Sequence, residues 1–166
     1  MIYALRERLR PCGAERTKYP EVKATFEDIL KKDGKLVYKT RGVSMKPMLI
    51  QDRDLVIVEV PNGRLKPYDI ALYKRREQYV LHRVISVKED HYLIRGDNTY
   101  SVEKVPFDHV IGVLTAFVHN GREIRVTDRT FRVYSYLWNG MYPLRHMLVK
   151  GKRVSRRIIR NLVNHE

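Results

Sequence analysis

The feature that most constrains the fold of this chain is a succession of short apolar segments with a period of two between residues 35 and 127. Each segment mixes β-branched or aromatic residues with polar ones, and clusters of Gly, Pro, Asn or Asp separate it from the next. Because successive side chains on a strand point to opposite faces, such segments are typical of strands with one face in a core. We expect seven strands, at 35–40, 54–60, 69–75, 79–87, 91–95, 109–118 and 123–127.

Seven short strands with no helices between them favour a mainly β fold, either a coiled β-sheet or a barrel. Helical periodicity occurs only on the two sides of this region. Residues 21–32 predict a short amphipathic helix that stops at Asp33-Gly34. From residue 128 the pattern predicts basic C-terminal helices. One face of the first of them contains Phe131, Tyr134, Leu137 and Trp138.

A length of 166 residues suits one domain with one hydrophobic core. The chain contains neither an internal repeat nor a linker long enough to separate two domains. We therefore expect residues 1–166 to form a single domain with three parts: an N-terminal arm and helix (1–34), a β core (35–127) and a basic helical tail (128–166).

The charge of the chain is concentrated toward its end. The formal net charge is +14, and residues 122–166 hold 11 basic side chains against 3 acidic ones. An amphipathic helix over residues 144–163 has two interpretations, a solvated face packed on the domain or peripheral contact with an anionic membrane. No recognition motif accompanies the charge, so the sequence disfavours nucleic acid as a partner.

The cysteine and histidine content argues against a metal site. A lone Cys12 excludes an internal disulfide and favours a reducing compartment, so we expect a cytoplasmic or membrane-peripheral protein. The N-terminus lacks the apolar stretch of a secretory signal, and no apolar run reaches the ~18 residues of a membrane span. The histidines show no metal-ligand spacing, and we expect neither a metal nor a cofactor.

Three polar positions stand out against this background. Ser44 lies between a strand and the turn fixed by Pro47, His82 is the one titratable residue among apolar neighbours on a strand, and Asp97 lies in a Gly-Asp-Asn turn. A serine hydroxyl becomes nucleophilic when a base removes its proton, and a carboxylate on the second ring nitrogen of a histidine fixes its tautomer. These three side-chain types predict a hydrolase site with Ser44 as nucleophile, His82 as general base and Asp97 as the acid that orients the histidine.

The segments GVSMKP, DLVIVEV, LKPYDIAL, LHRVI and RGDN resemble the successive boxes of the signal peptidase I superfamily, which includes the LexA-type self-cleaving repressors. The resemblance runs from about Lys35 to Gly112. It implies a signal-peptidase-like or LexA-like coiled β fold and a serine endopeptidase that cleaves an extended peptide or leader segment. Bacterial signal peptidases and LexA-type proteins use a lysine base, whereas the archaeal and endoplasmic-reticulum branch uses a histidine. His82 is similar to the histidine of that second branch, and we expect a member of it that has no membrane anchor.

Two departures from the resemblance leave alternatives at the site. The endoplasmic-reticulum type has further acids after the GDN turn, so Glu103 is the alternative third member to Asp97. Signal peptidases usually have a hydroxyl two residues before the nucleophile, where this chain has Gly42, so backbone N–H groups would carry more of the oxyanion charge. We expect Gly42 and Met45 at the oxyanion site and cleft, with core packing as the other interpretation of Met45.

Two other interpretations remain open. Ser44, His82 and Asp97 could be a turn residue, a core histidine and a backbone-capping acid, in a non-catalytic peptidase-like fold that docks on anionic lipid or an acidic partner. Self-cleavage of the LexA type is the second. A Cys12-Gly13 bond precedes Ser44 by 31 residues counted from Gly13, which is similar to the position of the cleaved bond in those relatives.

Overall fold

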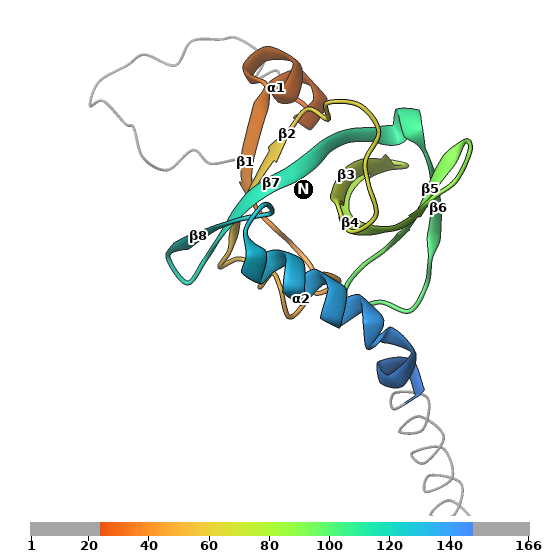
Figure 1. The fold of residues 1–166 in the computed structure, drawn as a ribbon. Helices are drawn as coiled ribbons and strands as arrows, with labels where there is room; N and C mark the ends of the chain where they lie inside the picture. Colours follow the sequence, from red (N-terminus) through yellow and green to blue (C-terminus); the bar gives the residue numbers. More distant parts are fainter. Residues whose placement is uncertain (1–23, 148–166) are drawn as a thin grey trace, which may run out of the picture.

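The fold is mainly β, as the sequence predicts. The computed structural model describes residues 24–147, in which eight strands form one antiparallel sheet in the order β1-β2-β7-β3-β4-β5-β6, with β8 on β7. The sheet coils strongly but does not close, because β1 and β6 do not pair (Figure 1). The strands are β1 (Lys35–Lys39), β2 (Leu55–Glu59), β3 (Ile70–Arg75), β4 (Gln78–Val87), β5 (His91–Arg95), β6 (Glu103–Pro106), β7 (Val110–His119) and β8 (Arg122–Arg125).

The seven predicted strands are all present, and β6 is an additional one. Within β6 only Val105 is buried, and the strand lies at the end of the sheet, where it pairs with β5 alone. A four-residue strand with one inward side chain and a terminal proline has too little alternation to be recognised from the sequence. A short 3-10 helix, η1 (Phe107–His109), connects β6 to β7.

The predicted N-terminal helix is α1 (Phe26–Asp33), and it begins later than the expected residue 21. Thr25 caps it, since its hydroxyl accepts a hydrogen bond from the Asp28 N–H at 3.2 Å while Asp28 accepts one from the Thr25 N–H at 3.0 Å. Gly34 ends the helix in the left-handed conformation, with φ of 68°. The helix packs on the sheet through Leu30 and the half-buried Phe26 and Ile29.

The apolar side chains form two clusters on the two faces of β3. Ile70 and Leu72 belong to the cluster that α1, β1, β2 and the segment after Ser44 also enter. Ala71 and Tyr73 belong to the cluster on the other face, which β5 and β6 complete. Because β3 is covered on both sides, its four residues Ile70 to Tyr73 are all buried and its neighbour β4 carries buried side chains on two faces as well.

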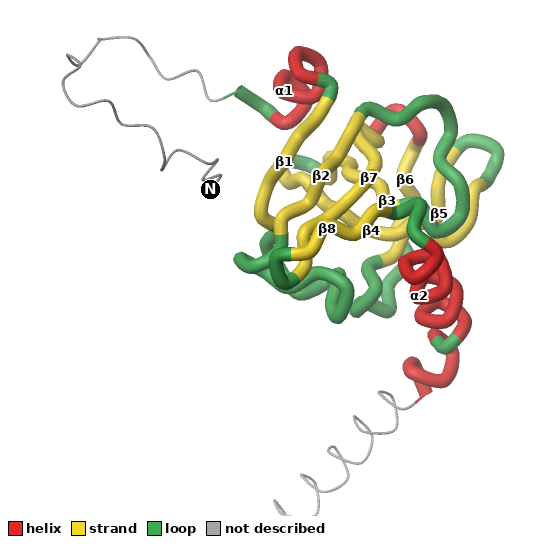
Figure 2. Tube along the Cα trace, turned by 60° about the vertical axis from the view of Figure 1, so that its left-hand side comes forward, coloured by secondary structure: helices red, strands yellow, loops and turns green. Residues whose placement is uncertain are grey.

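The second helix, α2 (Arg129–Gly140), lies beside the coiled sheet, and Figure 2 shows it running past one edge of the strands. Phe131 is buried, and Tyr134 and Trp138 are half-buried, as predicted. Leu137 was expected on the same face, and this is wrong, because it is 61% exposed. No helix within residues 24–147 is both long and apolar enough to cross a membrane.

Candidate functional site

The segment around Ser44 is a series of turns that directly follows β1. Two contacts from Asn98 hold it: the Asn98 N–H donates to the Ser44 carbonyl at 2.7 Å, and the Asn98 side-chain amide donates to the Val43 carbonyl at 3.1 Å. On the other side, Met45 and Met48 enter the hydrophobic core. The serine is therefore held between a packed pair of methionines and the turn after β5.

Met45 does not line a cleft, because its side chain is only 6% exposed. This burial favours the interpretation of Met45 as a core residue over a position in the cleft. Gly42 has φ of 90°, a conformation that favours glycine, and its N–H donates to the side chain of Gln51 at 3.0 Å. Gly42 thus gives the chain a left-handed turn just before Ser44, and its backbone N–H is already hydrogen-bonded.

His82 occupies the middle of β4, between β3 and β5, and is 6% exposed. Ala71 of β3 is its cross-strand partner, and the small side chain leaves space for an imidazole on that face of the sheet. The neighbouring residue Arg83 points to the opposite face, as the alternation of a strand requires. The strand therefore presents two buried basic side chains in two separate environments.

Ser44 and His82 meet at Gly96, the residue after β5. A methyl group at Gly96 would lie 2.7 Å from the Ser44 carbonyl oxygen and 3.0 Å from Nε2 of His82. Both atoms therefore border the space that a side chain at position 96 would fill. The structure therefore places the Ser44 backbone carbonyl near the edge of the His82 ring that carries Nε2.

The other ring nitrogen of His82 faces Tyr73 and Glu103. The Tyr73 hydroxyl lies 3.3 Å from Nδ1 and donates to Oε2 of Glu103 at 3.0 Å, while Oε1 of Glu103 lies 3.8 Å from Nδ1. Because the hydroxyl has given its one proton to Glu103, its oxygen can only accept from Nδ1. This arrangement favours the tautomer with the proton on Nδ1 and a free lone pair on Nε2.

The imidazole is held in its neutral form. Burial lowers the pKa of His82, and the nearby Glu103 carboxylate only partly opposes this effect, which Arg75 reinforces. Arg75 also donates to Oε1 of Glu103 at 2.9 Å, so the carboxylate keeps its own cationic partner. A neutral imidazole with a free Nε2 is a competent proton acceptor at neutral pH.

Asp97 directly follows Gly96 in the sequence, but its carboxylate binds Arg83 and not His82. Both of its carboxylate oxygens accept hydrogen bonds from the Arg83 guanidinium, at 2.7 Å each, and both side chains are buried. This bidentate pair lies on the opposite face of β4 from the imidazole. Of the two acids named from the sequence, the structure places Glu103 beside His82 and Asp97 beside Arg83.

Helix α2 completes the surroundings of Asp97, which sequence analysis did not anticipate. Ser135 accepts from Arg83 at 2.8 Å, and the Trp138 indole and Arg145 donate to the Asp97 carbonyl at 3.0 and 3.1 Å. The Asp97 turn is therefore fixed from the α2 side.

Sequence analysis also missed Tyr73 of β3, whose hydroxyl lies near His82. The one signal that could have identified Tyr73 as a site residue was its position two residues from Ala71, on the strand beside His82.

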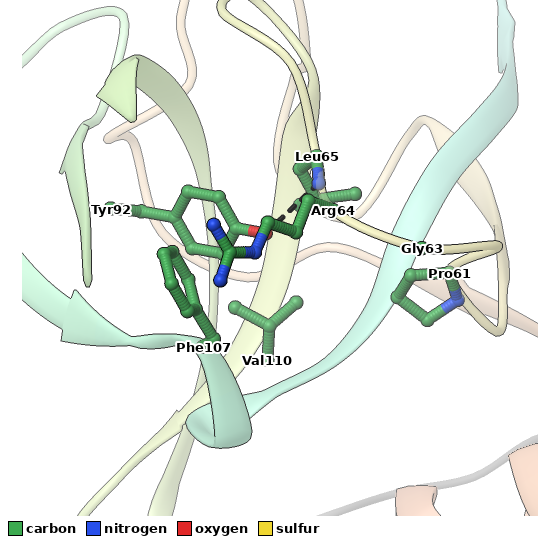
Figure 3. A pocket seen from close by; sticks show the side chains of 7 residues that line it. All are labelled: Pro61, Gly63, Arg64, Leu65, Tyr92, Phe107 and Val110. Atoms are coloured by element: carbon green, nitrogen blue, oxygen red, sulfur yellow. Dashed lines mark hydrogen bonds between the residues drawn. The ribbon is translucent and has the colours of Figure 1, made fainter. Parts of the chain in front are cut away.

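A separate small pocket of about 300 Å³ lies between the loop after β2, β5 and η1 (Figure 3). The Arg64 guanidinium lies over the Phe107 ring at 4.6 Å, and the Leu65 N–H donates to the Tyr92 hydroxyl at 2.9 Å. Neither Ser44 nor His82 lines it. Among residues 24–147, no three His, Cys, Asp or Glu side chains are grouped closely enough to hold a metal ion.

Comparison with known proteins gives a family match for this chain. No curated protein sequence matches the chain. Residues 11–115 match the family model described as Peptidase S24-like, a range that includes Ser44, His82, Glu103 and the sheet as far as β7. Since the match covers more than half of the chain and the fold is a coiled β-sheet, the chain belongs to the Peptidase S24-like family.

Proposed function

We propose that the chain is a serine endopeptidase in which Ser44 is the nucleophile and His82 the general base, as in the Ser/His branch of signal peptidases. The observation that carries the proposal is the orientation of one ring. Nε2 of His82 borders Gly96 next to the Ser44 backbone, and Nδ1 faces Tyr73 and Glu103. A general base requires this polarity, with an acceptor toward the nucleophile and an acid behind it.

The proposed reaction is acyl transfer through Ser44. Nε2 of His82 accepts the hydroxyl proton as Oγ attacks the peptide carbonyl, and the resulting imidazolium is stabilised by the Glu103 carboxylate. The imidazolium then protonates the leaving amine, which breaks the C–N bond and leaves an ester on Ser44. Water, deprotonated by the same ring, hydrolyses that ester and restores the serine hydroxyl.

We assign the third role to Glu103 rather than Asp97. Its oxygen lies 3.8 Å from Nδ1 and its contact through the Tyr73 hydroxyl is shorter, whereas both oxygens of Asp97 are occupied by Arg83. Tyr73 is then a positioning residue that keeps the ring in its orientation. The backbone N–H of Ser44, rather than the already bonded N–H of Gly42, is the oxyanion donor that this assignment favours.

The substrate in this proposal is an extended peptide. β1 ends at Lys39, five residues before Ser44, and lies at the first position of the sheet order, where it pairs with β2 alone. A sheet edge of this kind can add a peptide as a further strand through main-chain hydrogen bonds. A peptide added along β1 would run toward the nucleophile.

The test is cleavage of a complex peptide mixture by the purified chain, followed by mass spectrometry. Ser44→Ala is expected to abolish every new peptide end that the wild type creates. Ser101→Ala is the matched control, because Ser101 is an exposed serine outside the site and its loss should leave the cleavage unchanged. Identical new ends from the Ser44→Ala variant would contradict the proposal.

Self-cleavage is a second candidate, supported by the match to the family model from residue 11 onward, which includes Cys12 and Gly13. These two residues lie outside the described part of the chain. Cleavage at that bond would release an N-terminal fragment, so intact mass after incubation at raised pH tests it. If the mass stays unchanged under conditions in which the chain cleaves other peptides, self-cleavage is contradicted but the peptidase proposal is not.

A further inference from the structure

The outward side of α2 carries a continuous row of exposed apolar side chains. They are between 44% and 71% exposed, although aliphatic and aromatic residues of this size are usually covered in a folded domain. We call this row the outer stripe. It consists of Val133, Tyr136, Leu137, Met141, Leu144 and Met147.

The outer stripe extends past the end of α2 into a second helical segment, which follows a turn at Met141. Residues 142–147 are helical, and the Met141 N–H donates to the Leu137 carbonyl and the Arg145 N–H to the Met141 carbonyl, at 3.0 Å each. At 100° per residue the three members within α2, Val133, Tyr136 and Leu137, fall within an arc of roughly 100°. They therefore form one face and not a scatter of exposed residues.

The helix cannot rotate to bury this face, since its inner face is already fixed. Phe131 and Ser135 are buried, Trp138 binds the Asp97 carbonyl, and the Tyr142 hydroxyl donates to the Tyr100 carbonyl at 3.1 Å. The Arg95 guanidinium also stacks on the Tyr142 ring at 3.4 Å. A partner for the outer stripe must therefore come from outside the described fold.

Charge decides which kind of partner fits. Residues 129–165 contain nine Arg and Lys side chains and no Asp or Glu. Two of them, Arg129 and Arg132, are exposed within α2. An apolar helix face with cations and without acids is the composition of a helix that lies in the interface of an anionic bilayer.

We propose that the outer stripe docks on an anionic lipid surface, with its apolar side chains in the interface and the flanking arginines at the headgroups. The docking surface begins at Val133, earlier than the predicted residues 144–163, most of which lie outside the described part of the chain. Docking does not depend on the peptidase proposal, because the outer stripe and the Ser44 turn share no residue. Docking would, however, attach α2, the helix that holds the Asp97 turn, to the lipid surface.

The test is sedimentation of the full chain with vesicles of phosphatidylcholine and phosphatidylglycerol, and with vesicles of phosphatidylcholine alone. Binding is expected on the anionic vesicles and is expected to fall as salt is raised. Val133→Asp should weaken the binding by about tenfold or more, since it removes an apolar contact and adds a repelled charge. Val60→Asp is the matched control, because Val60 is 53% exposed and Val133 56%.

Leu144→Asp provides a second variant, and thermal unfolding of each variant shows that the fold is retained. Equal binding by Val133→Asp and the wild type, or equal binding to both kinds of vesicle, would overturn the proposal. So would a dimer in light scattering that Val133→Asp dissociates, because a second copy would then cover the outer stripe. Vesicle binding that survives in Ser44→Ala separates this test from that of the proposed reaction.

Discussion

Two adjacent residues of β4 place basic side chains on opposite faces of the strand. The two side chains differ in how closely they are hydrogen-bonded. Arg83 has a bidentate pair with Asp97 at 2.7 Å and further contacts with Ser135 and the Tyr68 carbonyl. Within residues 24–147 the polar contacts of His82 are longer, 3.3 Å to the Tyr73 hydroxyl and 3.8 Å to Glu103. Both are buried, so the difference is one of pairing. A fully paired cation stabilises the fold, whereas a neutral, loosely paired ring can still exchange a proton.

Loss of the ring should give the largest effect and leave the fold nearly intact. His82→Gln is expected to lower peptide hydrolysis by about 10⁴-fold, since a serine without its base keeps only the contribution of binding and oxyanion contacts. Cleavage rates on one identified peptide give the comparison. His109→Gln, at an exposed histidine, is the control. Hydrolysis by His82→Gln within tenfold of the wild type would remove His82 as the base.

Loss of the acid on the other face should act on stability instead. Asp97→Asn leaves Arg83 buried with a neutral partner, and removal of one member of a buried pair costs about 3 to 5 kcal/mol of unfolding free energy. Glu103→Gln should cost about 1 kcal/mol or less, because its partner Arg75 is half exposed. Urea unfolding of the two variants measures the difference, and equal losses would contradict the division between the two faces.

Gly96 joins the two environments, and a side chain there should disturb the reactive one. In Gly96→Ala the new methyl group would meet the Ser44 carbonyl at 2.7 Å and Nε2 of His82 at 3.0 Å, so the serine and the ring must separate. We expect hydrolysis to fall by about 10²-fold, the usual result of a small misplacement. Gly140→Ala meets nothing within 4 Å and should leave the rate unchanged.

The smallest effect concerns pH. Burial lowers the pKa of His82, so the acidic limb of kcat/KM should have its midpoint below the ordinary histidine value of about 6.5. Glu103 raises the pKa of the ring, and its removal must lower it further. In Glu103→Gln the limb should therefore move to lower pH, with a loss of rate of about tenfold. A limb that moves to higher pH would exclude Glu103 as the neighbouring acid.

The sheet was predictable because the burial of its strands depends on alternation, which the sequence displays directly. β6 was missed because Val105 is its one buried residue. Ser44 and His82 were predicted as site residues from their segments and from a resemblance that covers nearly half of the chain. Both lie in local structure that a strand and a turn determine, without reference to distant residues.

The choice between Asp97 and Glu103 could not be read from the sequence, because it depends on which face of β4 each acid reaches. Asp97 pairs with Arg83, and Arg83 also donates to Ser135 of α2, which covers that face. Contacts of α2 also bear on the error at Leu137. The inner face of α2 includes the bond from Trp138 to the Asp97 carbonyl, a polar contact that hydrophobic periodicity does not register.

The contacts between α2 and the Asp97 turn also limit how this family member can evolve. A change at Arg83 removes the bidentate donor to the Asp97 carboxylate, and a change at Ser135 or Trp138 removes one hydrogen bond of the same network. Positions 83, 97, 135 and 138 should consequently change together in relatives, although 135 and 138 lie beyond the residues that the family model matches. Inheritance of the peptidase core would thus include a stretch of helix that the family match itself does not contain.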